Sequence, residues 1–132
     1  MKLLLDTHVW LWALQEPAQL GRKTQRLLEN MSTELWLSPV SIWEAALLAE
    51  RKRLRLNSSF EEWLVESQRQ WPVEEASLTS AVALVSREIS VSHQDPADRF
   101  IAATAAVYEL TLLTADQRLL EGRGYKHLSS KL

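Results

Sequence analysis

Short apolar runs alternate with longer amphipathic stretches along the chain. The short runs, bounded by polar residues, have the length of buried strands, whereas the longer stretches carry apolar residues at helical spacing. The predicted strands cover residues 2–5, 35–37, 110–114 and 125–128, with a weaker one starting at 72–73. Apolar strands that alternate with helices favour an α/β sandwich with a mostly parallel sheet covered by helices.

Capping signals set the bounds of several predicted helices. Ser38 before Pro39 is typical of an N-cap followed by proline at the first helical position. Residues 58–62 contain a capping box, and Asp95 before Pro96 indicates a further N-cap. The predicted helices run from the first strand to Pro17 and over about 20–30, 38–51, 59 onward, 77–88, 95–108 and 117–120. Because no repeat or linker-like tract interrupts this order, we expect a single domain over residues 1–132.

Four acidic residues stand where a predicted strand or helix begins or ends. Asp6 directly follows the first strand, Asp116 closely follows the strand at 110–114, and Asp98 lies in the first turn of a helix. Glu44 falls on the apolar side of its helix, where a carboxylate is costly unless it is paired or bound to metal. Ligands of open α/β sheets bind at the carboxyl ends of the strands. Carboxylates delivered there can converge, and a hard divalent cation is the simplest reason to keep such a cluster.

Each acid also has a purely structural interpretation. Asp6 and Asp116 could cap the helices that follow them. Glu44 could form an ion pair with Arg51 two turns further on. Asp98 could simply interact favourably with the dipole of its helix, where a first-turn acid contributes about 0.3–1 kcal/mol.

Composition narrows the classes of function. The 132 residues include no cysteine, which excludes disulfides, thiolate nucleophiles and Cys-based zinc sites and fits a reducing cytoplasm. A net charge of −2 disfavours a generic electrostatic nucleic-acid binder, whereas a nuclease that uses metal to neutralise phosphate remains compatible. The apolar runs are too short to span a bilayer.

The order of four acidic motifs resembles the PIN-domain family. The chain reads LLLDTH at 3–8, SIWE at 41–44, HQDPADR at 93–99 and LLTAD at 112–116. An acid after an apolar strand is common by itself, but four such motifs in this order cover essentially the whole chain. The branch that they resemble most is that of the VapC-like toxins of bacterial type II toxin–antitoxin systems.

The resemblance implies a PIN-like three-layer sandwich and an endoribonuclease that depends on Mg²⁺ or Mn²⁺. It also implies a homodimer and a cognate antitoxin that holds the toxin inactive. The catalytic and metal-binding set would be Asp6, Glu44, Asp98 and Asp116. The supporting residues would be Thr7, Thr114, Asp95 and Arg99.

Other residues of chemical interest have two interpretations each. Arg51, Lys52 and Arg53 could contact RNA phosphates or could complement the dipole at the end of their helix. His8 and His93 are available, although a lone histidine near a helix start more often has a packing role. The six tryptophans favour core packing, and an exposed subset would suit a dimer interface or a groove for a partner helix.

Three competing functions are open at this point. A haloacid-dehalogenase-type phosphatase would place a second Asp two residues after the first, and His8 stands there instead. A structural scaffold would give no reason for Glu44 on an apolar face. A non-toxin or non-catalytic PIN-fold nucleic-acid-binding module would be expected to have lost some of the acids, and all four are present.

Overall fold

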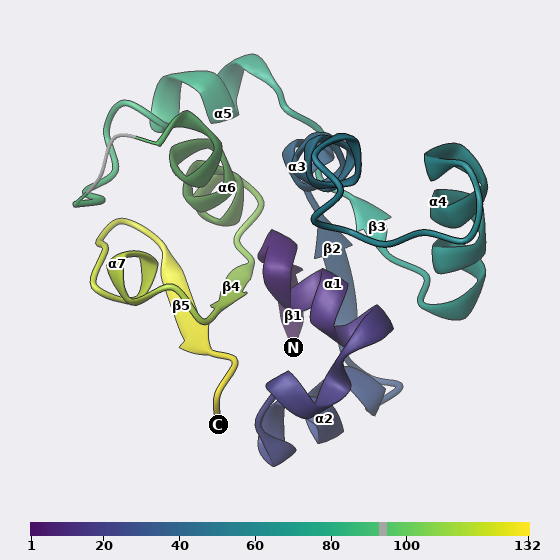
Figure 1. The fold of residues 1–132 in the computed structure, drawn as a ribbon. Helices are drawn as coiled ribbons and strands as arrows, with labels where there is room; N and C mark the ends of the chain where they lie inside the picture. The colour runs from purple at the N-terminus through teal and green to yellow at the C-terminus, as the bar shows by residue number, and fades with distance from the viewer. Residues whose placement is uncertain (93–94) are drawn as a thin grey trace.

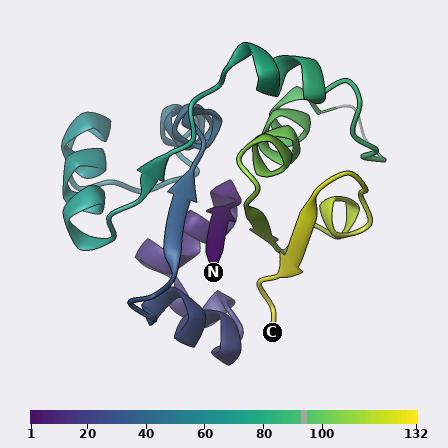
Figure 2. The ribbon, with the colours of Figure 1, turned by 180° about the vertical axis from the view of Figure 1, so that it is seen from behind.

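The computed structural model describes residues 1–92 and 95–132 and contains one five-stranded sheet (Figure 1). Neighbouring strands are parallel throughout, in the order β3-β2-β1-β4-β5, which can be followed in Figure 2. The strands are β1 (Lys2–Leu5), β2 (Glu34–Leu37), β3 (Glu74–Glu75), β4 (Thr111–Thr114) and β5 (Lys126–Ser129). The parallel α/β sheet expected from the sequence is confirmed.

The helices follow the predicted order. They are α1 (Thr7–Gln15), α2 (Arg22–Glu29), α3 (Pro39–Glu50), α4 (Phe60–Gln70), α5 (Ser80–Val85), α6 (Pro96–Val107) and α7 (Gln117–Leu120), with a 3₁₀ turn at Pro17–Gln19. The predicted caps are in place: the side chains of Ser38, Ser59 and Asp95 accept backbone N–H groups of α3, α4 and α6. None of the helices in the described ranges has the length and apolarity needed to cross a membrane.

Several elements begin or end one or a few residues from their predicted bounds, and two of these differences have a visible cause. The weak strand predicted at 72–73 begins two residues later, because its position is set by pairing of Glu74 with Trp36 and of Glu75 with Leu37. The helix predicted over 77–88 is shorter, since Thr79 caps its start and its last turn tightens after Val85. Pairing partners and tight turns of this kind depend on contacts that local periodicity does not contain.

Side chains of β1 point alternately to the two faces of the sheet and join two separate cores. Leu4 packs with Ile101 of α6 and with Leu112 of β4. Leu3 and Leu5 pack on the opposite face with residues that α1, α2 and α4 contribute. All three β1 leucines are fully buried, as expected for a parallel sheet covered on both faces.

The parallel arrangement brings the carboxyl ends of the strands to one edge. Leu5 pairs with Leu113, and the backbone N–H of Asp6 donates to the carbonyl of Leu113 at 3.0 Å. The chain then enters α1 immediately after β1, and α7 shortly after β4. Because β2 leads into α3 at the same edge, the acidic residues after β1, β2 and β4 all start from one side of the sheet.

Candidate active site

Asp6 stands at the junction between β1 and α1 and is buried. Its Oδ1 accepts the backbone N–H of Thr7 at 2.9 Å, so it caps α1 as the structural alternative suggested. Its Oδ2 accepts a hydrogen bond from the Thr114 hydroxyl at 2.6 Å. Burial raises the pKa of Asp6 even though these two hydrogen bonds oppose the rise. Asp6 is therefore both a helix cap and a buried carboxylate with a raised pKa at the edge of the sheet.

Glu44 is tied to Asp6 through the neighbouring threonine. The Thr7 hydroxyl donates to Glu44 Oε1 at 2.5 Å and lies 2.8 Å from the Ser41 hydroxyl in a second hydrogen bond. Because a hydroxyl has a single proton, Ser41 can supply the proton of that second bond. Burial, the Thr7 bond and the charge of Asp6 act on Glu44 in that order of size, and the net effect raises its pKa.

Within the described residues, Glu44 does not form the ion pair with Arg51 that was its structural alternative. Thr7 holds the Glu44 carboxylate, and no ion pair between Glu44 and Arg51 occurs in the described part of the chain. Glu44 is half-buried on α3, as its place beside the apolar stripe predicted.

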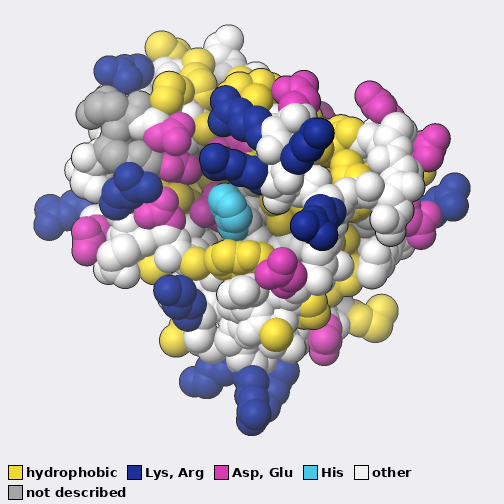
Figure 3. All heavy atoms as spheres, in the orientation of Figure 1, with side chains coloured by type: hydrophobic (Ala, Val, Ile, Leu, Met, Phe, Trp, Pro, Cys, Tyr) yellow, Lys and Arg dark blue, Asp and Glu magenta, His cyan; other side chains and the backbone are white. Residues whose placement is uncertain are grey.

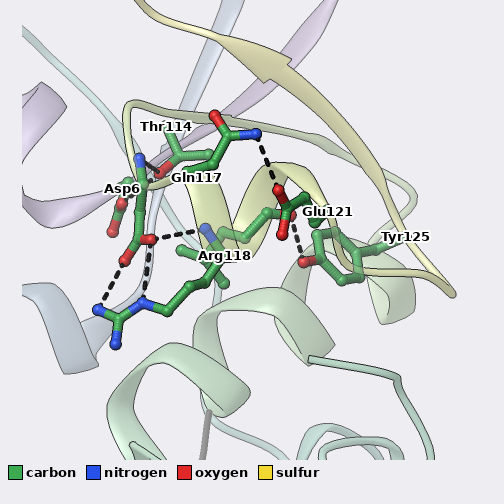
Figure 4. Close-up of polar contacts among 8 residues, drawn as sticks. Asp6, Thr114, Gln117, Arg118, Glu121 and Tyr125 are labelled. Carbon is green, nitrogen blue, oxygen red and sulfur yellow. Dashed lines mark hydrogen bonds and ion pairs between the residues drawn. The ribbon is translucent and has the colours of Figure 1, made fainter. Parts of the chain in front are cut away.

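Thr114 links the first and fourth acids. Its hydroxyl donates to Asp6 and accepts the backbone N–H of Asp116 at 3.0 Å. Asp116 then caps α7, because its Oδ1 accepts the backbone N–H of Arg118 at 2.9 Å. The Arg118 side chain folds back onto the same carboxylate, with 3.4 Å from Nε to Oδ1 and from Nη2 to Oδ2 (Figure 4).

Asp98 is an acid whose pKa is raised by burial and by the charges of the other acids in the cluster. It lies in the first turn of α6, half-buried, while Asp95 caps that helix by accepting the backbone N–H of Ala97 at 2.9 Å. Burial and, after it, the charges of Asp6, Asp95, Glu44 and Asp116 raise the pKa of Asp98 from 3.8 to about 7. The four predicted acids and Asp95 thus share one electrostatic environment.

These side chains line one pocket of about 410 Å³, called here the acid pocket. Its lining residues are Asp6, Thr7, His8, Trp12, Glu44, Asp95, Asp98, Ala115, Asp116 and Arg118. Figure 3 shows Asp and Glu side chains gathered around a histidine on one face, with Lys and Arg side chains beside them. The structure therefore brings the four predicted acids together from four separate elements.

The donor chemistry of the acid pocket fits a hard divalent cation. Carboxylate oxygens are the ligands that Mg²⁺ prefers. Because the carboxylates repel one another, a bound cation would stabilise the pocket. Within residues 1–92 and 95–132, however, no three His, Cys, Asp or Glu side chains form a ready coordination group. Thr7, Thr114 and Arg118 engage three of the acids instead. The carboxylates would have to move toward one another to hold a metal.

Arg99 does not line the acid pocket. It is buried, and its guanidinium donates to three backbone carbonyls before α6: Nε to Ser86 at 2.9 Å, Nη2 to Ile89 at 3.1 Å and Nη1 to Val91 at 3.5 Å. A side chain occupied in this way holds the 86–91 segment against α6. It supports the site only through the framework.

The remaining predicted residues lie around the site. Arg51, Lys52 and Arg53 are exposed beyond α3, and Lys52 adopts a left-handed φ of 58°. Arg53 borders a neighbouring pocket of about 270 Å³ that shares His8 and Trp12 with the acid pocket. His8 is exposed and packs against Trp12, whereas His93 lies outside the described residues, as does Gln94 of the third motif.

Sequence reasoning gave no role to three residues in or next to the site, although Ser41 stood in the second acidic motif. Ser41 was visible as a serine one helical turn before Glu44. Arg118 was visible as a cation two residues after Asp116. Tyr125 gave no local signal: its hydroxyl donates to the carbonyl of Leu119 at 2.6 Å, and burial with the nearby acids raises its pKa to about 12.

Comparison with known proteins agrees with this architecture. Residues 3–124 match the PIN domain. The chain is 34% identical over 126 residues to ribonuclease VapC22 of Mycobacterium tuberculosis, with 95% of this chain and 92% of the relative covered.

Solved structures share the fold at lower identity. A chain of VapBC2 from Rickettsia felis, solved bound to a promoter DNA fragment, has a TM-score of 0.70 and 14% identity, with 98% of both chains covered. A chain of DNA-bound VapBC from Salmonella typhimurium has a TM-score of 0.66 and 20% identity, again with 98% of both chains covered. With four acids at the carboxyl edge of a parallel sheet and a family match over most of its length, the chain belongs to the PIN domain family.

Proposed function

We propose that this protein is a ribonuclease that hydrolyses RNA phosphodiester bonds at the acid pocket, as the toxin of a type II toxin–antitoxin system. The observation that carries the proposal is the convergence of Asp6, Glu44, Asp98 and Asp116 from four elements onto one pocket. Identity to a named ribonuclease over nearly the whole chain supports the same activity. Residues 1–132 would form one PIN-like nuclease domain acting in the cytoplasm.

Mg²⁺ or Mn²⁺ would be held by the same four carboxylates. When bound, such an ion lowers the pKa of a water and stabilises charge on the phosphoryl oxygens. The chain's own residues would prepare the site: Thr7 orients Glu44 and Thr114 orients Asp6, because each donates a hydrogen bond to one carboxylate oxygen. Both threonines are buried, so each hydrogen bond holds its carboxylate close to the place that a cation would occupy.

RNA would approach across the face that also carries Arg53. The pocket beside Arg53 shares His8 and Trp12 with the acid pocket. Arg51 and Lys52 are close to Arg53 in sequence and exposed, which suits contacts to phosphates along a single strand.

A homodimer and a cognate antitoxin are part of the proposal. Trp43 is the exposed member of the six tryptophans, with 60% of its surface accessible. It borders an apolar groove of about 410 Å³ formed by Pro39, Val40, Trp43, Leu78, Asp95, Pro96, Ala97 and Phe100, called here the apolar groove. Exposed apolar surface of this kind is typical of a contact with another protein.

The activity test is cleavage of single-stranded RNA by the purified, antitoxin-free protein. We expect cleavage with Mg²⁺ or Mn²⁺ and none in excess chelator, since the acid pocket needs a cation. Cleavage that persists in chelator would exclude the proposed mechanism. Protein purified in parallel as Asp6→Asn controls for contaminating ribonucleases.

A non-toxin or non-catalytic PIN-fold nucleic-acid-binding module is the second candidate. The observation in its favour is that Arg118 forms an ion pair with Asp116, so one of the four acids is already partly neutralised by the chain itself. Expression in bacteria separates the two functions: a toxin should arrest growth, and Asp6→Asn should relieve the arrest. Harmless expression of soluble, folded wild-type protein would favour the non-toxin module.

A further inference from the structure

Arg118 is the only Lys or Arg among the described residues that line the acid pocket. Its side chain is 57% exposed and meets both oxygens of Asp116 at 3.4 Å. Charge-assisted hydrogen bonds of this kind are usually about 2.7–2.9 Å long. The guanidinium therefore rests on Asp116, whose side chain is 25% exposed, through a long and partly solvent-screened contact that is weaker than a close ion pair.

The fold does not depend on this contact. The N-cap of α7 is formed by the backbone N–H of Arg118 and Asp116 Oδ1 at 2.9 Å, and any residue at 118 keeps that bond. The Arg118 side chain extends from α7 to the carboxylate with which it pairs (Figure 4) and lines the acid pocket. A side chain that is exposed and unnecessary for its own helix is free to serve a ligand.

An RNA strand meets an electrostatic problem at this pocket. Five carboxylates line it, and phosphate is repelled by each of those that is ionised. A guanidinium is the side chain best suited to phosphate, because its planar fork donates two parallel hydrogen bonds. Arg118 carries that fork, already inside the pocket, and holds it in the fork geometry against a carboxylate.

We propose that Arg118 is a substrate-binding residue that contacts an RNA phosphate and rests on Asp116 when RNA is absent. The inference relies on the proposed ribonuclease function and adds a coupling to it. While Arg118 neutralises Asp116, it competes with a divalent cation for that carboxylate. An RNA phosphate that draws Arg118 away removes this competitor of the cation, so RNA and metal favour each other's binding.

The test measures two affinities of Arg118→Gln without any turnover. Mg²⁺ binding is measured by calorimetry in the absence of RNA. Binding of a short single-stranded RNA is measured in chelator, over a series of salt concentrations. Arg69→Gln is the control for loss of a surface arginine, because Arg69 forms a more exposed pair with Glu66 at 3.8 Å on α4 and does not line the acid pocket.

The expected result is a pair of opposite changes. Arg118→Gln should bind Mg²⁺ about threefold to tenfold more tightly, because a competing cation is gone. It should bind RNA about fivefold to tenfold more weakly, and its logarithmic salt slope should fall by roughly one phosphate contact. Arg118→Lys should keep most of the salt slope but lose part of the RNA affinity, since it lacks the fork. Arg69→Gln should change neither affinity.

Two results would overturn the inference. Unchanged RNA affinity and salt slope in Arg118→Gln, with wild type binding both ligands, would remove Arg118 from the substrate and leave the ribonuclease proposal intact. Weaker binding of both Mg²⁺ and RNA by Arg118→Gln would indicate that Arg118 has a structural role. If wild type binds neither Mg²⁺ nor RNA, the proposed function itself fails, so the two failures are distinguishable.

Discussion

The acid pocket and the apolar groove are neighbouring hollows of the same size with opposite chemistry. Each encloses about 410 Å³ and each is bordered by Asp95. The apolar groove is walled by Trp43, Phe100 and other apolar side chains, whose exposure can be relieved by contact with another protein. The acid pocket is lined by carboxylates that repel one another, and only positive charge can offset this repulsion. This difference is the reason why the proposed protein contact is placed at the groove and the proposed chemistry at the acid pocket.

Asp6→Asn should give the largest difference between the two hollows. Removing one buried carboxylate weakens cation binding, which is worth several kcal/mol to phosphoryl transfer, so RNA cleavage should fall roughly a thousandfold. Trp43→Ser in the apolar groove should keep cleavage within about threefold. A single-turnover assay on an RNA oligonucleotide measures both. Equal losses in the two variants would contradict the division of roles.

Arg99 should affect the framework and leave the chemistry in place. Arg99→Met leaves the carbonyls of Ser86, Ile89 and Val91 without their donor, which should lower the free energy of unfolding by about 2–3 kcal/mol. Urea denaturation measures this loss, and Mg²⁺ affinity should be unchanged at a temperature where the variant is folded. Loss of Mg²⁺ binding by a stably folded Arg99→Met would restore Arg99 to the site itself.

Asp98→Asn should stabilise the metal-free protein in a pH-dependent way. Between the ordinary pKa of 3.8 and the native value of about 7, native Asp98 holds a proton that the unfolded chain has lost. The free energy of unfolding of wild type should therefore decrease as the pH rises through this window. Thermal melts at pH 5 and pH 8 should show Asp98→Asn gaining about 1 kcal/mol more at pH 8, after solvent screening of a half-exposed carboxylate.

The paired control is Asp95→Asn, three residues earlier on the same helix start. Asn caps about as well as Asp, so this variant should keep α6 and most of the metal binding. Asp98→Asn should abolish RNA cleavage. If Asp98→Asn instead lowered the metal-free melting temperature and kept full activity, Asp98 would be a helix-start residue only.

The smallest expected change in stability belongs to Trp43. Its indole is 60% exposed, so Trp43→Ser should shift the free energy of unfolding of the monomer by no more than about 0.5 kcal/mol. The same variant should shift the monomer–dimer equilibrium toward monomer in analytical ultracentrifugation. A dimer of unchanged affinity would place the protein contact elsewhere.

Local patterns were sufficient for a parallel sheet and for the places of the acids, but not for the strand order or for the start of β3. The run of leucines in β1 predicts a buried strand, and the serine and proline before Glu44 predict where α3 begins. Asp6 and Asp116 could be placed because an acid directly beyond a parallel strand can lie only at one edge of the sheet. That the same acids also cap α1 and α7 shows that the structural and functional interpretations were compatible.

Contacts between distant segments were not accessible in the same way. The bond from Thr7 to Glu44 joins residues 37 positions apart, and that from Thr114 to Asp6 joins residues 108 apart. Arg99 appeared to belong to the third acidic motif, but its guanidinium serves carbonyls up to 13 residues earlier in the chain. The role of Arg99 depends on the side of α6 from which its side chain projects, and the motif alone does not determine that side.

If the carboxylates act as one cluster that requires a cation, the ionisation of Asp98 must depend on whether a cation is bound. Carbon-detected NMR titration of the Asp98 carboxyl group, with and without Mg²⁺, measures this dependence. We expect a pKa of about 7 in metal-free protein and a large decrease when Mg²⁺ binds. An Asp98 that titrates near 3.8 in both conditions would show that the acids neither repel one another nor share a cation.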